Sequence, residues 1–383
     1  MADSKMKRNP VVSTSSPLDD FNTHRLEVEA AISRVLESGV YIDGKETEAF
    51  EVELAEYIGA KHVISVNSGT DALSLSLRAL GIGIGDEVIT VSHTALATVA
   101  AIVATGATPV VIDVDPSTMT MDVHQVLNAV GEHTKAIMPV HLYGHPADMV
   151  DLEKIASVHG IPIVEDCAQA IGAEISGRRV GTIGHLGCFS FYPTKNLGAM
   201  GDGGAITTND DHVASRLRRI KQYGWDAERI GQEFGVNSRM DEIQAAILRT
   251  KLNRLDQMNR ARQQIAETYL TTLADSAASL PVTLPAHTHV YHLFVVQHEQ
   301  RDSIRTALRS RGIGAGIHYA TPAHLHPGYR QNVRVAHSDP KTFGLPITEK
   351  LARTVLSIPV HPGLSTSASM IANDVKEIID SIN

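Results

Sequence analysis

Between residues 60 and 208, short apolar runs alternate with stretches of helical periodicity. Runs of four or five residues have the length of buried strands, and they lie at 63–66, 87–91, 109–112, 136–140, 161–164, 188–191 and 205–208. This alternation is typical of a mostly parallel sheet with helices on both faces. We therefore predict an α/β fold whose functional site lies beyond the carboxyl ends of the strands.

After residue 208 the pattern changes. One long helix is predicted over about residues 239–272, because apolar positions recur at Ile243, Ala246, Ile247, Leu252 and Leu255. A smaller α+β region follows, with strands near 293–296 and 313–317 and a final helix near 371–379.

These changes predict three parts of the chain. Residues 1–20 are rich in Ser, Pro, Lys and Asp and are expected to form a mobile leader. Residues 21–250 are expected to form the large domain. Residues 251–383 are then the connector helix and a small C-terminal domain.

Composition narrows the class of protein. The 383 residues carry a net charge of -9, and no basic run is long enough to follow a nucleic-acid backbone. No apolar run approaches the roughly 20 residues of a membrane span. The two cysteines, Cys167 and Cys188, lie in apolar segments, which favours buried thiols in a reducing compartment and hence a cytoplasmic protein. The 19 histidines show no metal-ligand spacing, so no metal site is predicted.

Lys195 is the leading catalytic candidate. It lies between the aromatic run 188–191 and the glycine-rich stretch 198–204, where backbone can approach a ligand closely. Taken by itself, Lys195 is more readily explained as a solvated loop lysine. Asp166, at the end of an apolar run, changes that reading, because pyridoxal phosphate enzymes need a lysine for the cofactor aldehyde and a carboxylate for its pyridine nitrogen.

A phosphate site is predicted at residues 67–72. This segment follows the strand 63–66 and opens a helix over 71–79, so backbone N–H groups and the positive end of the helix dipole converge there. An ordinary N-capped helix is the alternative, because Ser and Thr favour caps in any protein. Together with Lys195 and Asp166, the segment points to Gly69 and Thr70 as phosphate ligands.

These motifs resemble, in family order, those of the DegT/DnrJ/EryC1/StrS family of pyridoxal phosphate-dependent sugar aminotransferases. The resemblance runs from about residue 40 to 362 and rests on segments 38–44, 67–73, 85–89, 165–169, 187–204, 235–242 and 317–319. It implies the aspartate aminotransferase-like fold type I, with a mostly parallel seven-stranded sheet, a smaller C-terminal α+β domain and an obligate homodimer.

The resemblance also implies roles for single residues. Asp166 binds the pyridine nitrogen, and Gln169 lies against the ring hydroxyl. Ser190 binds the phosphate, although a strand hydroxyl bonded to backbone is the alternative. Asn237 reaches the phosphate of the partner subunit, unless it caps the helix that follows.

The chain departs from the family pattern at Ala95. Family members usually place an aromatic residue there, over the cofactor ring. We expect His93 to present a flat imidazole in its place, and the alternative is a histidine that caps the next helix.

Five residues are candidates for the sugar nucleotide: Tyr41, Tyr192, Arg239, His318 and Tyr319. His318 and Tyr319 resemble the family's contact pair, and Tyr41 lies in an early loop that often reaches substrate. Structural roles are open for all five. Tyr192 packs against a strand in that case, and Arg239 pairs with Asp241.

The implied reaction moves an amino group from an amino acid, by resemblance L-glutamate, to a keto-sugar nucleotide. Segment 235–239 is more similar to members that act on 3-ketosugars, which favours a dTDP-3-keto-6-deoxyhexose. The alternatives are a 4-keto-sugar nucleotide or a keto-cyclitol. A dehydratase of the family would carry histidine in place of Lys195, and an inert regulatory homologue would not need Lys195 or Asp166.

Overall fold

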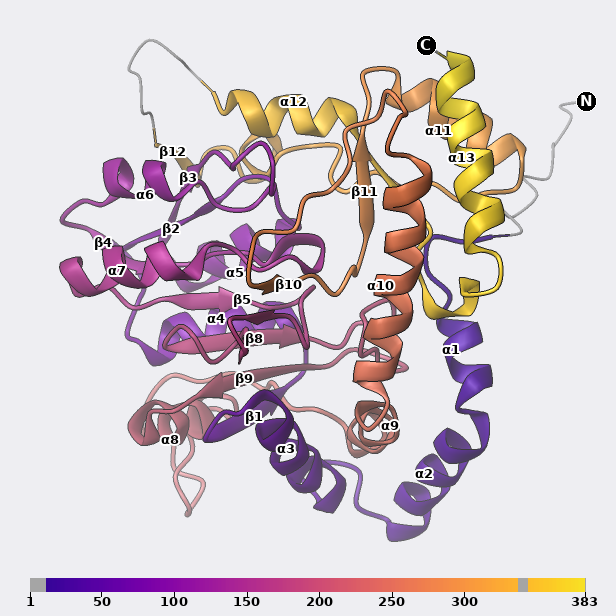
Figure 1. Cartoon of the computed structure of the whole chain (residues 1–383). Helices are drawn as coiled ribbons and strands as arrows, with labels where there is room; N and C mark the ends of the chain where they lie inside the picture. The colour runs from indigo at the N-terminus through magenta and orange to yellow at the C-terminus, as the bar shows by residue number, and fades with distance from the viewer. Residues whose placement is uncertain (1–11, 337–343, 383) are drawn as a thin grey trace, which may run out of the picture.

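The computed structural model describes residues 12–336 and 344–382, and a mixed sheet crosses the larger part of the molecule (Figure 1). One group of strands has the order β1 (His62–Val66), β9 (Gly204–Thr208), β8 (Leu186–Ser190) and β5 (Val164–Asp166). The other has the order β12 (Arg334–Val335), β3 (Thr108–Ile112), β2 (Glu87–Val91) and β4 (Thr134–Ile137). Parallel bridges Ile137–Ile163 and Val140–Asp166 join the two groups.

The predicted α/β fold with a mostly parallel sheet is confirmed. In the two groups, β9 runs antiparallel to both of its neighbours and the other pairs are parallel. The pairing differs in detail from one seven-stranded ladder. It gives two four-stranded groups in the described chain, because the pairing between β4 and β5 is reduced to isolated bridges.

Helices cover both faces of this sheet. They are α4 (Gly69–Ala79), α5 (Leu96–Thr105) and α8 (Asp211–Ile220) on one face, and α6 (Val123–Ala129) and α7 (Met149–His159) on the other. The strand β2 shows why both faces of the sheet are covered. Val88 packs with α4 and α5 while its neighbour Ile89 packs with α6 and α7, because successive side chains of a strand point to opposite faces.

The C-terminal part packs beside the sheet. Its elements are α10 (Leu255–Thr272), β10 (His287–Thr288), β11 (Phe294–Gln297), α11 (Arg301–Ser310), η2 (Ala323–Leu325), α12 (Pro346–Thr354), β13 (Val355–Ile358), η3 (Pro362–Leu364) and α13 (Ala368–Ile382). β11 pairs with β13, and α10 lies beside α13 (Figure 1). Residues 313–317, predicted as a strand, pair only through single bridges at Ile313 and Gly316. The remaining short elements are η1 (Leu142–Gly144), β6 (Glu174–Ile175) and β7 (Arg178–Arg179).

The single helix predicted over 239–272 is wrong. Helix α9 (Glu242–Leu252) ends before Asn253, and α10 starts at Leu255 after Arg254, whose φ and ψ are -116° and 1°. The guanidinium of Arg254 bonds to Glu27 in α2 (Arg25–Ser38). The buried positions continue in register across the break, so the pattern alone does not reveal it.

The predicted mobile leader lies partly outside the described residues, which begin at Val12. Val12 pairs with the C-terminal part, since its N–H donates to the carbonyl of Gly312 at 3.0 Å and its carbonyl accepts from Gly314 at 2.7 Å. Helix α1 (Pro17–Thr23) follows, with Ser16 as its N-cap. Residues 12–20 therefore contact the body of the protein.

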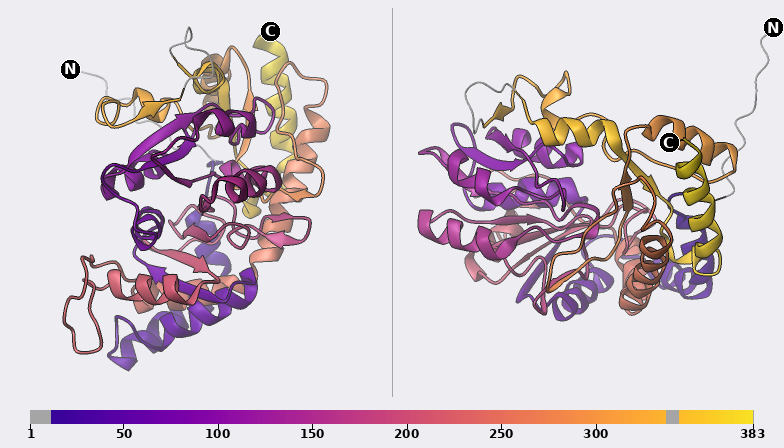
Figure 2. Two further views of the ribbon diagram at one scale, coloured as in Figure 1. Left: turned by 90° about the vertical axis from the view of Figure 1, so that its left-hand side faces the viewer. Right: turned by 45° about the horizontal axis from the view of Figure 1, so that its top comes forward.

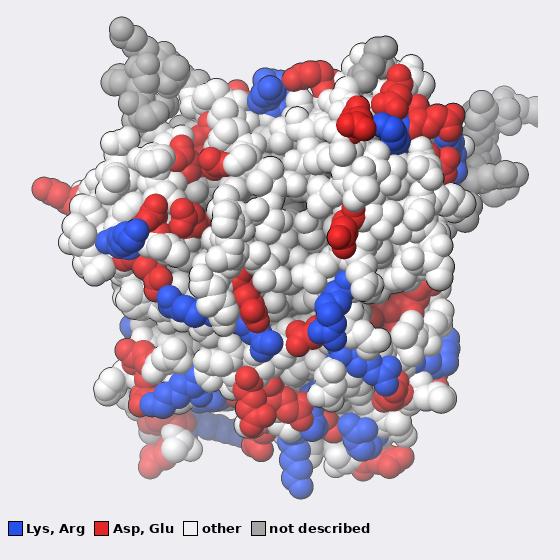
Figure 3. Space-filling model, viewed as in Figure 1, with Lys and Arg blue, Asp and Glu red and all other residues white. Residues whose placement is uncertain are grey.

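The segment between α8 and α9 projects from the edge of the sheet (Figure 2). Bridges Gln222–Asn237 and Trp225–Gly231 close it into an extended hairpin-like loop. Acidic and basic side chains are interspersed over the face drawn in Figure 3. No helix within the described ranges is both long and apolar enough to cross a membrane.

Candidate active site

A cavity of about 270 Å³ lies at the carboxyl ends of β1, β2, β5 and β8. Seven of the residues predicted from the sequence line it: Gly69, Thr70, Asp166, Gln169, Ser190, Tyr192 and Lys195. They come from three separate segments of the chain, 69–70, 166–169 and 190–195. The sheet therefore brings the predicted lysine, carboxylate and phosphate segment to one place.

Asp166 is a buried carboxylate with few donors. It ends β5, is 5% exposed, and accepts from the Thr98 hydroxyl at 2.8 Å and from the Ala168 N–H at 3.2 Å. Burial raises the pKa of Asp166, although these two bonds and the charge of Lys195 oppose the rise. A cationic N–H group in the cavity would stabilise the ionised carboxylate, as a protonated pyridine nitrogen does.

Lys195 follows β8 in a tight loop, in which its N–H donates to the carbonyl of Tyr192 at 2.8 Å. Burial lowers the pKa of its amine to about 8, while the negative charge of Asp166 raises it. An amine with such a pKa has a far larger neutral fraction near physiological pH than an ordinary lysine, and only the neutral amine attacks a carbonyl group. The site therefore fits a covalent amine catalyst.

The start of α4 forms a cradle beside Ser190. A Cβ atom on Gly69 would lie 2.6 Å from the Cβ of Ser190, so only glycine allows this approach. The Ser68 hydroxyl caps Asp71 N–H, as in an ordinary helix, but the first N–H groups of a helix have no partner within it. Ser190 Oγ accepts a long bond from Tyr192 N–H, at 3.4 Å, which leaves its own proton to donate. This donor set fits a phosphate group.

Gln169 links the cavity to the C-terminal part. Its carbonyl oxygen accepts from Tyr143 N–H at 2.7 Å, and its amide donates to the Tyr319 hydroxyl at 2.9 Å. The Tyr143 hydroxyl in turn donates to the carbonyl of His318. The predicted pair His318 and Tyr319 therefore lies against the rim of the cavity, held by a tyrosine that the sequence analysis missed.

His93 does not occupy the predicted stacking position. It is 1% exposed, and its Nε2 lies 2.7 Å from the Tyr143 hydroxyl. Burial lowers its pKa to about 4. Thr94 and Ala95 line the cavity instead, and Ala95 is also the N-cap residue of α5, so His93 is not a helix cap either. The imidazole is turned into the interior by its hydrogen bond, and the methyl group of Ala95 faces the space.

Tyr41, Asn237 and Arg239 lie outside the lining that the described chain gives the cavity. Asn237 is exposed, and Asp241 rather than Asn237 precedes α9. The carbonyl of Tyr41 accepts from Glu242 N–H at 3.0 Å, which ties the early loop to α9.

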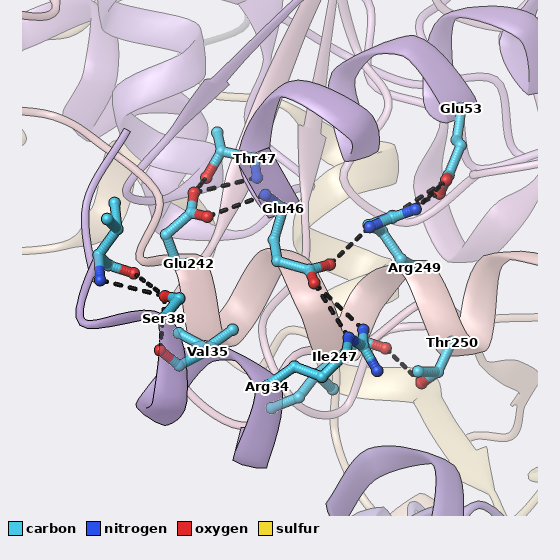
Figure 4. Close-up of polar contacts among 11 residues, drawn as sticks. Arg34, Val35, Ser38, Glu46, Thr47, Glu53, Glu242, Ile247, Arg249 and Thr250 are labelled. Atoms are coloured by element: carbon cyan, nitrogen blue, oxygen red, sulfur yellow. Dashed lines mark hydrogen bonds and ion pairs between the residues drawn. The ribbon is translucent and has the colours of Figure 1, made fainter. Parts of the chain in front are cut away.

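A polar cluster fixes this early loop further. The Glu242 carboxylate accepts from the N–H groups of Gly44, Glu46 and Thr47 at the start of α3 (Lys45–Ile58), as Figure 4 shows in part. Arg249 of the same helix α9 bonds to Glu46 and Glu53. Helices α3 and α9 are thus joined through charged side chains.

His141, Glu165 and Cys167 place three potential metal-ligand atoms within 4.8 Å of one another. The Glu165 carboxylate already accepts from the N–H groups of Gly181, Ile183 and Gly184 and pairs with His141 at 2.9 Å. His141 Nδ1 accepts from Ala147 N–H. These atoms are engaged in the fold, which favours a structural role for the cluster.

Comparison with known proteins gives the family. Residues 22–382 match the family model described as the DegT/DnrJ/EryC1/StrS aminotransferase family. The chain belongs to this family.

Two curated relatives illustrate its range. The dTDP-3-amino-3,4,6-trideoxy-alpha-D-glucose transaminase of Streptomyces venezuelae is 49% identical over 89% of this chain and 88% of the relative. The UDP-N-acetyl-3-dehydro-alpha-D-glucosamine 3-aminotransferase of Acidithiobacillus ferrooxidans is 41% identical over 92% and 94% of the two chains.

Among solved structures, DesV of Streptomyces venezuelae in complex with a ketimine intermediate superposes with a TM-score of 0.92, at 46% identity over 96% of this chain and 98% of that one. These similarities confirm the predicted fold type and a pyridoxal phosphate-dependent sugar aminotransferase. They leave the particular sugar and the amino donor to be proposed.

Proposed function

We propose that this aminotransferase moves the amino group of L-glutamate to the keto carbon of a dTDP-3-keto-6-deoxyhexose. The observation that carries the proposal is the shared cavity in which Lys195, Asp166 and the start of α4 converge. Both curated relatives carry position 3 of the sugar in their names, which supports amination at that position. They differ in the nucleotide, so dTDP is supported by the more similar of the two.

The cavity supplies a place for each part of pyridoxal phosphate. Asp166 would hold the pyridine nitrogen, Gln169 the ring hydroxyl, and the amides of Gly69 and Thr70 with Ser190 the phosphate. When bound, the cofactor supplies an electrophilic carbonyl and a ring that withdraws electrons. Ala95, which lines the cavity, carries no aromatic side chain that could stack on the cofactor ring.

Lys195 has two tasks in the proposed reaction. Its amine would hold pyridoxal phosphate, through the electrophilic carbonyl that the cofactor supplies. As a free amine, Nζ would take a proton from the α-carbon of the donor and, in the second half of the reaction, give a proton to the sugar carbon that receives the amino group. A pKa of about 8 suits both directions of transfer. The sugar is aminated by the reverse sequence, so ping-pong kinetics are expected.

A second copy of the chain would complete the site. Asn237 is exposed on the projecting loop, and large apolar side chains near it and near the cavity are exposed as well: Val40, Tyr41, Ile42, Tyr192 and Phe234. Such side chains favour a subunit interface. We infer that Asn237 of one subunit meets the phosphate in the other, and that Tyr41 and Arg239 reach the sugar nucleotide there.

Mixing two inactive variants tests the shared site. Neither Lys195→Met nor Asn237→Ala should be active alone, but a mixed dimer has one site with both residues intact, and about a quarter of the activity should return after subunit exchange. No recovery in a mixture shown to contain mixed dimers would contradict the sharing.

A single-turnover absorbance assay tests the reaction. Glutamate should bleach the band of the cofactor-loaded protein, and the 3-keto dTDP-sugar should restore it while the 4-keto isomer does not. Restoration by the 4-keto isomer alone would establish the alternative position. Loss of a hydroxyl in the product mass would mean a dehydratase, and a band that no amino acid changes would support an inert homologue.

A further inference from the structure

The loop that carries Lys195 has a cavity on each side. The substrate cavity lies on one side, and a second cavity of about 90 Å³ borders residues 193–195 on the other. The second cavity is also lined by Asp20 of α1, Arg262 of α10 and His361. Because dispersion contacts are lost wherever a cavity replaces packed atoms, residues 193–195 are held less closely by packing than Leu197 and Ala199, which are 1% and 2% exposed in a hydrophobic cluster.

Polar contacts from α9 and α10 also hold this loop in place. Lys251 Nζ donates to the carbonyl of Gly198 at 2.7 Å, and the Gln244 side chain accepts from Met200 N–H at 2.9 Å. The Asn196 amide donates to the Asn259 side chain at 2.8 Å. The loop is therefore held by side chains of two helices as well as by the packing of Leu197 and Ala199 in a hydrophobic cluster.

Lys251 differs from the other two because it brings a charge. Its side chain is 3% exposed, and its ammonium pairs with the Asp20 carboxylate. A buried ammonium is stable only when it is paired and hydrogen-bonded, so the contact with Asp20 stabilises the Lys251 side chain in its position beside the loop. The pair connects α1, near the start of the described chain, to the loop of the reactive lysine.

We propose that Lys251, with Asp20 as its counter-ion, is a positioning residue that fixes the Lys195 loop. The inference rests on the proposed role of Lys195. If Lys251 is removed, the Gly198 carbonyl loses its donor, and residues 193–195, which border the second cavity, have space to move. The Lys195 amine then moves away from its desolvated position.

The ionisation of Lys195 reports its position. Its amine faces Asp166, and the imidazoles of His292 and His318 are close enough to feel its charge. Burial keeps both imidazoles neutral, so desolvation dominates and lowers the pKa of Lys195 to about 8. A displaced amine gains water, and its pKa rises.

The test is acetylation of cofactor-free protein with acetic anhydride over a range of pH, read by mass spectrometry of the Lys195 peptide. In the unmodified protein the midpoint should lie near pH 8. Lys251→Met should raise it by about one unit and slow labelling at pH 8 by about fivefold. Lys251→Arg, which keeps the charge and a donor, should restore the midpoint.

Lys221→Met is the matched control. Lys221 is also buried, donates to the carbonyl of Ser65 at 3.0 Å and lies 3.9 Å from Glu51. The Lys221→Met variant should have a lower free energy of unfolding, while the midpoint of Lys195 acetylation stays unchanged. If Lys251→Met also lowers stability but leaves that midpoint unchanged, the proposal is wrong.

Should Lys251→Met fail to fold, Asp20→Asn takes its place, with a raised midpoint supporting the proposal and an unchanged one overturning it. The readout needs no sugar and no turnover. A failure here is therefore distinguishable from a failure of the proposed reaction.

Discussion

Two nearly buried carboxylates in this molecule have opposite surroundings. Glu242, in the cluster that joins α3 to α9, is 2% exposed and accepts from three backbone N–H groups and the Thr47 hydroxyl (Figure 4). Asp166, in the cavity, is 5% exposed and accepts from one hydroxyl and one N–H group of the described chain. The first region is saturated with donors and the second is not.

The contrast separates stability from function. A buried carboxylate with a full set of donors stabilises the fold, whereas one that lacks them is destabilised until a ligand supplies what is missing. Arg249 extends the saturated region, since its two carboxylate partners raise its pKa, with Glu53 as the largest cause. Lys195 belongs with Asp166, because burial disfavours its charged form and lowers its pKa. Asp166 and Lys195, whose charged forms are disfavoured by burial, both line the cavity.

The largest expected effect follows from removing the reactive amine. Lys195→Met should reduce amino transfer by more than about a thousandfold, because both the covalent link and the proton transfer are lost. The free energy of unfolding of the cofactor-free protein should not fall at pH 7, since a desolvated amine is replaced by an apolar chain of similar length. Turnover assays and urea unfolding check the two parts. A large loss of stability would contradict the contrast.

Glu242→Gln should act in the opposite way. The amide keeps one acceptor oxygen but sets an NH₂ group against backbone donors, so the free energy of unfolding should fall by about 2 kcal/mol. Turnover per folded molecule should stay within about twofold of the unmodified protein, because Glu242 does not line the cavity. Unfolding curves and active-site titration give both numbers. A stability loss below measurement error would mean that the cluster is not a stabilising unit.

Asp166→Asn should stabilise the cofactor-free protein by roughly 1 kcal/mol at pH 7.5. The sign follows from linkage. Because the folded protein has a raised pKa at Asp166, it gains stability as protons bind, and this gain is fully present below the pKa of the unfolded chain and lost as pH rises through the folded pKa. The advantage of Asn should therefore shrink as pH falls toward 4. An advantage that grows on acidification would reverse the assignment.

The smallest effect is expected at Arg249→Lys. The change keeps the positive charge but loses the forked bonds to Glu46 and Glu53, which are partly exposed to water. Thermal unfolding should show a loss of about 0.5–1 kcal/mol. The Lys195 acetylation midpoint should not change, and a shift there would mean that the two regions are coupled.

The sequence predicts the parts of the site that depend on strand ends. Asp166 ends a strand, Lys195 follows one, and Gly69 and Thr70 open the helix after a third. These three strands run in the same direction, with the antiparallel β9 between β1 and β8, so their carboxyl ends lie at one edge of the sheet. The fold class follows from the same alternation. These predictions succeed because they need only local periodicity and one topological rule.

Other features depend on contacts between distant segments. His93 was predicted at the cavity, but its bond to Tyr143, 50 positions later, turns it inward. The break between α9 and α10 accompanies a bond from Arg254 to Glu27, 227 positions away. The pairing of Lys251 with Asp20 has the same character. Neither side-chain direction nor long-range pairing is encoded in a local pattern of apolar residues.

The central claim is that Asp166, a carboxylate with few hydrogen-bond donors, and the amine of Lys195 form the cofactor site in the cavity. Borohydride reduction of the pyridoxal phosphate-loaded protein, followed by peptide mass mapping, tests it most directly. The mass of the reduced cofactor should appear on the peptide that contains Lys195, and Asp166→Asn should weaken loading. A label on another lysine, with Lys195 unmodified, would contradict the account.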